Sequence, residues 1–165
     1  MLKGVSVISD KRYAYGLDLS MSCSGIAIVD MDTLQPVHTI SIKTNDKLCH
    51  GERLHHQREI MKRIVEKFPP EVVFYEKGFT NFNTATQVIF RVVGVFNELL
   101  KDYKTEYFAP ATVKKVITGN GKGTKELLRD KLLERYPQIK FNNTDESDAL
   151  GVVFTGLIKK YKMKW

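Results

Sequence analysis

The sequence predicts an α/β fold with a mixed central sheet flanked by helices. Apolar alternation over 13–44 indicates strands, a continuous apolar run at 72–75 indicates a strand buried on both faces, and helical spacing dominates the rest. A chain of 165 residues is near the usual size of one domain. We therefore expect 1–165 to form a single domain, with an N-terminal extension over 1–12 and a basic tail over 159–165.

Three antiparallel strands are expected between residues 13 and 44. Apolar residues alternate with small or polar ones from Tyr13 to Leu19 and again from Val37 to Lys43, while Gly25–Val29 is apolar. Short polar links between these runs favour a meander. The run 72–75 shows no alternation, so we expect it at the centre of the sheet and parallel to its neighbours.

Helical spacing, proline positions and polar caps predict five helices and one more strand. The helices are expected over 52–68, 83–100, 111–117, 125–136 and 145–161, and a short strand over 106–109. The Pro69–Pro70 pair ends the first helix because proline cannot continue one. Asn143 or Thr144 can cap the last helix.

The charge balance favours a polyanionic partner. Lys and Arg number 26 against 19 Asp and Glu, which gives a net charge of +7. Many basic proteins do not bind nucleic acid, so charge leaves this question open. Cys23 and Cys49 are too few for a disulfide scaffold, and no stretch approaches the length of a membrane span. We expect a cytoplasmic protein without membrane contact.

Four carboxylates lie where a fold gains nothing from burying charge. Asp18 interrupts the first strand, Glu76 ends the run 72–75, and Asp145 and Asp148 lie three residues apart at the start of the last helix, so they share a face. Isolated buried carboxylates are costly, so something cationic should face them. Glu76 should lie at the carboxyl edge of the sheet, where α/β folds place ligands, and it meets Asp18 if their strands are neighbours.

Clustered carboxylates without arginine partners repel one another and raise one another's pKa, and divalent cations relieve this repulsion. Mg²⁺ is the natural candidate, and Mn²⁺ is a plausible substitute. Two such ions about 4 Å apart activate a water and stabilise the leaving oxygen of a phosphodiester. Each acid also has a structural alternative, since acids at a helix start complement its dipole and Glu76 could end a strand in solvent. Together the four predict hydrolytic nuclease chemistry.

Three motifs follow one another in a specific order. They are Gly16–Ser20 leading to Gly25–Val29, then Val73–Phe79, and finally Asp145–Leu150 with its DxxDAL pattern. Their order and spacing, over residues 13–158, resemble the RuvC Holliday junction resolvases of the RNase H-like superfamily. The resemblance implies an RNase H-like fold in which Asp18, Glu76, Asp145 and Asp148 are the catalytic metal ligands.

The resemblance also implies a homodimer that nicks two strands of a four-way or otherwise branched DNA symmetrically. Phe79 matches the aromatic residue that inserts at the junction centre, and Lys114 and Lys125 match basic residues near the scissile phosphate. We also expect Lys122 to bind DNA. From the residues alone, Phe79 could be a core aromatic, and a solvated helix face explains either helical lysine. The helix over 83–100 has apolar surface for both core and partner.

One departure concerns the first motif. The family commonly continues Asp-Pro-Gly, whereas Asp18 is followed by Leu19, Ser20 and Met21. This divergence makes a phage-type member a reasonable reading, and we expect the protein in the cytoplasm of a bacterial or phage-infected cell.

Other functions share parts of this pattern. Sugar-kinase-like or actin-like ATPases also start with a Gly-x-Asp-x-Ser strand, but they pair two such lobes. In a non-catalytic DNA-binding relative, the four acids would have no evident purpose. A nuclease of the same fold that acts on structured RNA can be distinguished from a DNA nuclease only by substrate assays. Residues 119–124 do not match a nucleotide-binding loop. The spacing of Cys49, His50, His55 and His56 matches no standard zinc site.

Overall fold

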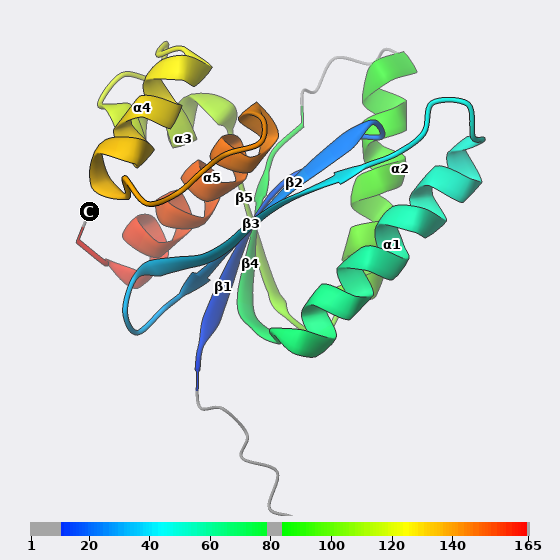
Figure 1. Ribbon diagram of the computed structural model, residues 1–165, viewed down its shortest axis with the longest axis horizontal. Helices are drawn as coiled ribbons and strands as arrows, with labels where there is room; N and C mark the ends of the chain where they lie inside the picture. The colour runs from blue at the N-terminus through cyan, green and yellow to red at the C-terminus, as the bar shows by residue number, and fades with distance from the viewer. Residues whose placement is uncertain (1–10, 79–83, 165) are drawn as a thin grey trace, which may run out of the picture.

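The computed structural model describes residues 11–78 and 84–164 (Figure 1). Most of the expected N-terminal extension, and Phe79, lie outside these residues. The described strands are β1 (Tyr13–Asp18), β2 (Cys23–Asp30), β3 (Gln35–Lys43), β4 (Pro70–Glu76) and β5 (Lys104–Phe108). The described helices are α1 (His50–Lys67), α2 (Thr84–Leu99), α3 (Pro110–Thr118), α4 (Lys125–Arg135) and α5 (Thr144–Tyr161).

The five strands form one mixed sheet in the order β3-β2-β1-β4-β5. β1, β2 and β3 are antiparallel, and β4 and β5 run parallel to β1, as expected. The expectation that the run 72–75 lies at the centre is wrong, because β1 holds that place and β4 lies beside it. The meander puts β2 and β3 on one side of β1, and the crossover through α1 delivers β4 to the other.

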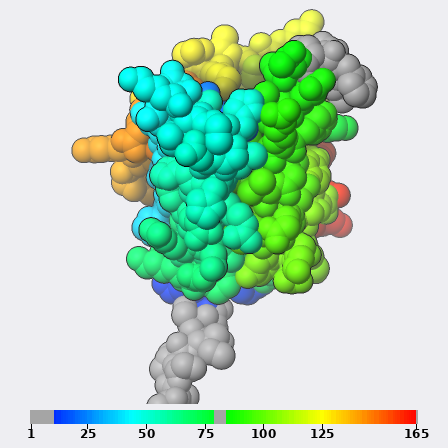
Figure 2. Space-filling model, turned by 90° about the vertical axis from the view of Figure 1, so that its right-hand side faces the viewer, coloured from blue at the N-terminus to red at the C-terminus, as the bar shows by residue number. Residues whose placement is uncertain are grey.

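Helices cover both faces of the sheet (Figure 1). α5, with α3 and α4 beside it, packs on one face against residues such as Ala14 and Phe74. α1 and α2 pack on the other face against Tyr15 and Tyr75, and Figure 2 shows these two helices side by side on the surface. Even-numbered residues of β1 and β4 therefore face α5, and odd-numbered ones face α1 and α2.

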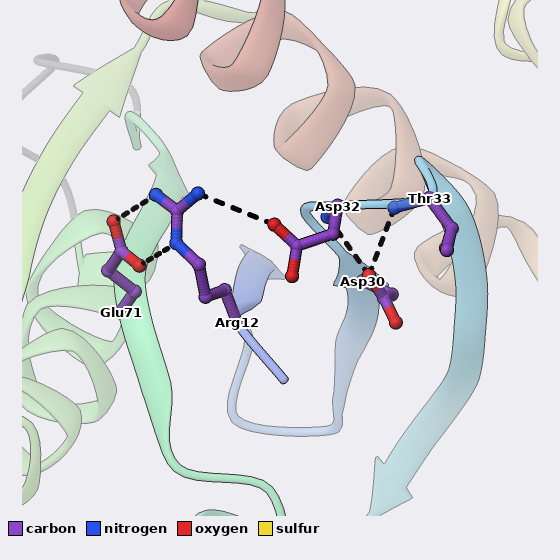
Figure 3. Close-up of polar contacts among 5 residues, drawn as sticks. All are labelled: Arg12, Asp30, Asp32, Thr33 and Glu71. Atoms are coloured by element: carbon purple, nitrogen blue, oxygen red, sulfur yellow. Dashed lines mark hydrogen bonds and ion pairs between the residues drawn. The ribbon is translucent and has the colours of Figure 1, made fainter. Parts of the chain in front are cut away.

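A polar clamp fixes the amino end of β1 (Figure 3). Arg12 donates two hydrogen bonds to Glu71, at 2.6 and 2.8 Å, and a longer one of 3.4 Å to Asp32. Asp30 accepts from the backbone N–H groups of Asp32 and Thr33 and so shapes the turn between β2 and β3. The hydrogen bond from Arg12 lowers the pKa of Glu71. The clamp ties β1, β2 and β4 together at one end of the sheet.

Within the ranges 11–78 and 84–164, no helix is both long and apolar enough to cross a membrane.

Candidate active site

The four acids singled out from the sequence line one pocket of about 320 Å³. Asp18, Glu76, Asp145 and Asp148 come from β1, β4 and the first two turns of α5, which are distant in the sequence. The pocket lies at the opposite end of β1 from the Arg12 clamp. The structure therefore brings together the acids that the sequence only suggested could meet.

Strand register places Asp18 beside Glu76. β1 and β4 are parallel neighbours in which Leu17 pairs with Tyr75, so the next residues end adjacent strands. Both are even-numbered, which turns their side chains toward α5. The carboxyl edge of the sheet thus presents two carboxylates to the start of that helix.

Hydrogen bonds at the start of α5 hold Asp145 and Asp148 at the pocket. Asn143 caps the helix through its side-chain oxygen, which accepts from the Glu146 N–H at 3.1 Å. The fully buried Glu146 accepts from the Asn142 backbone at 2.9 Å and from its side chain at 3.0 Å. These contacts fix the loop that enters α5, and hence the direction in which its first turn points.

Burial and mutual repulsion raise the pKa values of Asp18, Glu76 and Asp148, as expected. Burial, reinforced by the charge of Asp148, raises the pKa of Asp18 to about 7. Burial and the charges of Asp18 and Asp148 raise the pKa of Glu76 to about 8. The pKa of Asp148 is also raised by burial, although Lys125 opposes that shift. Near neutral pH, the site therefore holds protons that ordinary carboxyl groups would have released.

Lysines lie among these acids. Lys125, at the start of α4, forms an ion pair with Asp148, and this contact raises its own pKa although burial opposes the shift. Lys114 of α3 also lines the pocket, as does Lys77, which sequence reasoning missed although it directly follows Glu76. Lys122 is exposed in the turn between α3 and α4 and is not among the residues that line the pocket. Lys125 thus contacts an acid of the pocket, although its side chain is still half exposed.

The acids share a pocket without forming a closed ligand shell. In residues 11–78 and 84–164, no three His, Cys, Asp or Glu side chains are arranged closely enough to hold an ion as they stand. One carboxylate is engaged by Lys125, and burial favours the protonated form of two others. The donors themselves are all carboxylate oxygens, the chemistry that hard divalent cations prefer.

The family model of the crossover junction endodeoxyribonuclease RuvC matches residues 15–156. The RuvC protein of Wolbachia sp. subsp. Brugia malayi (strain TRS) is 30% identical over 156 residues, which cover 88% of this chain and 93% of that protein. The RuvC protein of Rickettsia massiliae (strain Mtu5) is 28% identical over 156 residues, which cover 88% and 96%.

The fold agrees with solved structures. The Thermus thermophilus RuvC structure superposes with a TM-score of 0.79 at 18% identity, over 91% of this chain and 96% of that one. The same protein in complex with Holliday junction substrate gives a TM-score of 0.79 at 16% identity. The expected RNase H-like architecture is therefore confirmed, and the chain belongs to the RuvC family of crossover junction endodeoxyribonucleases.

Proposed function

We propose that this protein resolves Holliday junctions by metal-dependent hydrolysis in the pocket formed by Asp18, Glu76, Asp145 and Asp148. Membership of the RuvC family makes it an endonuclease of crossover junctions. The observation that supports our assignment of residues is the convergence of four acids from β1, β4 and α5 in one pocket. A family nuclease needs such a site, and gathering one buried and three partly buried acids in one pocket is costly in any other role.

Family membership implies a divalent metal, and we propose that it is Mg²⁺, with two ions per site and Mn²⁺ as a substitute. When bound, such ions activate a water and stabilise the charge that develops on the phosphodiester. The four carboxylates would hold the ions. Asp148 would then exchange its ion pair with Lys125 for a metal contact, and Asp18 and Glu76 would release their protons.

The lysines at the pocket have a separate role in this proposal. Lys114 lines the pocket and is partly exposed, so its ammonium is placed to hold a DNA phosphate as a point charge. Lys125, once released from Asp148, is placed to do the same. Lys122 lies in an exposed turn, so its contact would be with DNA outside the pocket.

We assign the partner surface to α2. Phe90 is 54% exposed, and a side chain at Gly94, one helical turn further, would meet nothing within 4 Å. An exposed aromatic residue beside an open glycine suits close packing against the same helix of a second copy. Ile89, the neighbour of Phe90, lines the acid pocket, so this surface borders the site. A homodimer would supply two active sites for two symmetric nicks.

Phe79 follows Glu76 by three residues in the sequence, and we propose that it contacts DNA. An aromatic side chain can stack on an unpaired base at a junction centre. The variant Phe79→Ala should keep metal binding and lose junction processing. Normal cleavage by this variant would refute the role.

The direct test is cleavage by purified protein with Mg²⁺. A synthetic four-way junction should be cut faster than linear duplex or structured RNA, and mapping should show paired nicks at symmetric positions. Asp18→Asn and Glu76→Gln should abolish cutting and keep junction binding. Asp32→Asn, at the other end of the sheet, is the control and should cut normally. Equal loss of binding and cutting in both active-site variants, or preferred cutting of RNA, would contradict the proposal.

A further inference from the structure

A buried side chain outside the pocket holds the turn that joins β1 to β2. Gln57 of α1 is fully buried, and its amide nitrogen donates to the carbonyl oxygens of Ser20 at 2.9 Å and Met21 at 3.2 Å. Its amide oxygen lies 2.6 Å from the hydroxyl of the equally buried Ser24. Every polar group of the Gln57 side chain is thus directed at this one turn.

A second buried side chain of α1 reaches the same turn. Arg53 lies one helical turn before Gln57, and its guanidinium donates to Met21 O at 3.2 Å and to the Thr44 hydroxyl at 2.9 Å. The Thr44 hydroxyl in turn donates to Met21 O at 2.6 Å. Three side chains therefore converge on a single carbonyl oxygen of the turn.

The burial of these two polar side chains costs more free energy than a contact that only joins α1 to the sheet would require. Arg53 and Gln57 fall on the stripe of α1 that Met61 continues toward the core, where an apolar residue would need no hydrogen bonds. Among the residues that the structure describes, Arg53 donates to neutral oxygens and pairs with no carboxylate that would compensate for the burial of its charge. The polar stripe is explained if the turn itself must be held in one conformation.

The turn borders the acid pocket. Leu19 and Ser20 line that pocket together with Asp18, the last residue of β1. The Ser20 hydroxyl bridges the backbone N–H and carbonyl of Cys23, at 3.0 and 2.7 Å, and so closes the hairpin on itself. Asp18 is followed by Leu19 rather than proline, so the backbone has no ring to restrict it. Hydrogen bonds supply the restraint instead, both within the hairpin and from Gln57 of α1.

We propose that Gln57 is a positioning residue for the nuclease reaction. It holds the carbonyl groups of Ser20 and Met21, with help from Arg53, and thereby fixes the direction of the Asp18 carboxylate from the opposite face of the sheet. This inference rests on the proposed function, because it assigns the held carboxylate to catalysis. Gln57 itself does not line the acid pocket.

The test is Gln57→Met, which keeps the side-chain length and removes every hydrogen bond. Single-turnover cleavage of a four-way junction, measured against protein concentration at saturating Mg²⁺, separates the maximal rate from the half-saturating concentration. We expect the maximal rate to fall about tenfold or more, because a small misplacement of a reacting group is costly, while the half-saturating concentration stays unchanged.

Tyr15→Phe is the matched control. The Tyr15 hydroxyl also joins β1 to α1, through the carbonyl of Phe68 at the C-cap of the helix, but Tyr15 does not line the pocket. This variant should lower the melting temperature as Gln57→Met does and should keep the wild-type maximal rate. Ser24→Ala removes the hydroxyl that donates to the Gln57 amide oxygen. This variant replaces Gln57→Met in the test if Gln57→Met does not fold. Its effect on the rate should not add to that of Gln57→Met.

The inference is overturned if Gln57→Met cuts as fast as Tyr15→Phe, or if both rates fall in proportion to the melting temperature. A wild-type protein that binds Mg²⁺, as seen in its melting temperature, and does not cut junctions would instead overturn the proposed function. The two failures are therefore distinct.

Discussion

The backbone of Asp145 occupies the space that a side chain at Gly25 would need. A Cβ atom built on Gly25 would lie 2.0 Å from the Asp145 carbonyl oxygen, so the first turn of α5 rests directly on β2. Gly25 also pairs with Asp18 across the β1–β2 hairpin. The same close approach therefore supports the fold and brings two of the four acids together.

Gly25→Ala should separate α5 from the sheet. The new methyl group would meet backbone, which cannot move aside, so we expect a loss of about 3 kcal/mol in the free energy of unfolding and loss of cleavage. Urea denaturation measures the first effect. Gly51→Ala is the control, because the nearest atom to its new Cβ would be 3.9 Å away. If both variants unfolded at the wild-type urea concentration, the packing argument would be wrong.

Asp18→Asn should stabilise the metal-free protein at alkaline pH. Burial raises the pKa of Asp18 to about 7 from an ordinary 3.8, so between these values the folded state keeps a proton that the unfolded state has lost. The wild-type free energy of unfolding therefore falls as pH rises through this window. Asparagine cannot ionise, so the variant should be more stable by on the order of 1–3 kcal/mol near pH 8 and nearly equal near pH 4.

Denaturation in EDTA across this pH range gives the measurement. If the free energies of unfolding of wild type and variant changed with pH in parallel, the pKa of Asp18 would not be raised in the folded state. Glu76→Gln should likewise be more stable than wild type. Here the difference in the free energy of unfolding should keep growing up to about pH 8, because the pKa of Glu76 is about 8.

Cleavage at limiting Mg²⁺ should increase as the acids ionise. Asp18 and Glu76, with pKa values of about 7 and about 8, must lose protons before a cation can take their place, so the rate should rise between about pH 6 and about pH 8. Excess Mg²⁺ competes with protons and should shift the rise to lower pH. A midpoint that does not respond to Mg²⁺ concentration would contradict this linkage.

Lys125→Met should separate metal binding from cleavage. The ammonium of Lys125 forms an ion pair with Asp148 and therefore competes with Mg²⁺ for this carboxylate. Its removal should lower the Mg²⁺ concentration at which the increase in melting temperature caused by Mg²⁺ is half complete. The maximal cleavage rate should fall about tenfold or more, because a positive charge near the phosphate is lost.

Lys131→Met, on the same helix but paired with Glu134 at the surface, is the control and should leave both quantities unchanged. Weaker Mg²⁺ binding by Lys125→Met would show that Lys125 supports the metal site rather than competing with it.

Phe90→Glu should convert the proposed dimer to a monomer, because a charge would enter the apolar surface of α2. Analytical ultracentrifugation gives the mass, and junction cleavage should change from paired nicks to single ones. Leu127→Glu places the same charge at another exposed apolar residue, on α4, and should remain dimeric. If Phe90→Glu and Leu127→Glu both sedimented with the mass of the wild-type dimer, the partner surface would not be on α2.

The order and type of the elements followed from the sequence because each has a strong local signal. The bounds were less certain where the signal was polar. β5 runs over Lys104–Phe108 rather than 106–109, because Lys104 and Thr105 are exposed on an edge strand and show no apolar pattern. β4 begins at Pro70, because the missing N–H costs little at the first residue of a strand.

The acids of the pocket could be identified from the sequence because their charges interrupt an apolar pattern. The side chains that contact them or hold the adjoining turn could not be identified in this way. The ion pair of Lys125 joins residues 23 positions apart on two helices, and local pattern carries no information on such a contact. Arg53 and Gln57 were hidden among polar helix residues. Arg53, Gln57 and Met61 follow one another at intervals of four residues, and this spacing is the signal that places them on the buried stripe.

The Arg12 clamp has a practical consequence. β1 runs from this ion pair straight to Asp18, so Arg12 and Asp18 are about 20 Å apart. A fluorophore or affinity tag joined ahead of Lys11 would leave the scaffold at the far end from the cutting centre. Such an attachment offers a handle for single-molecule work in which label and substrate do not compete for room.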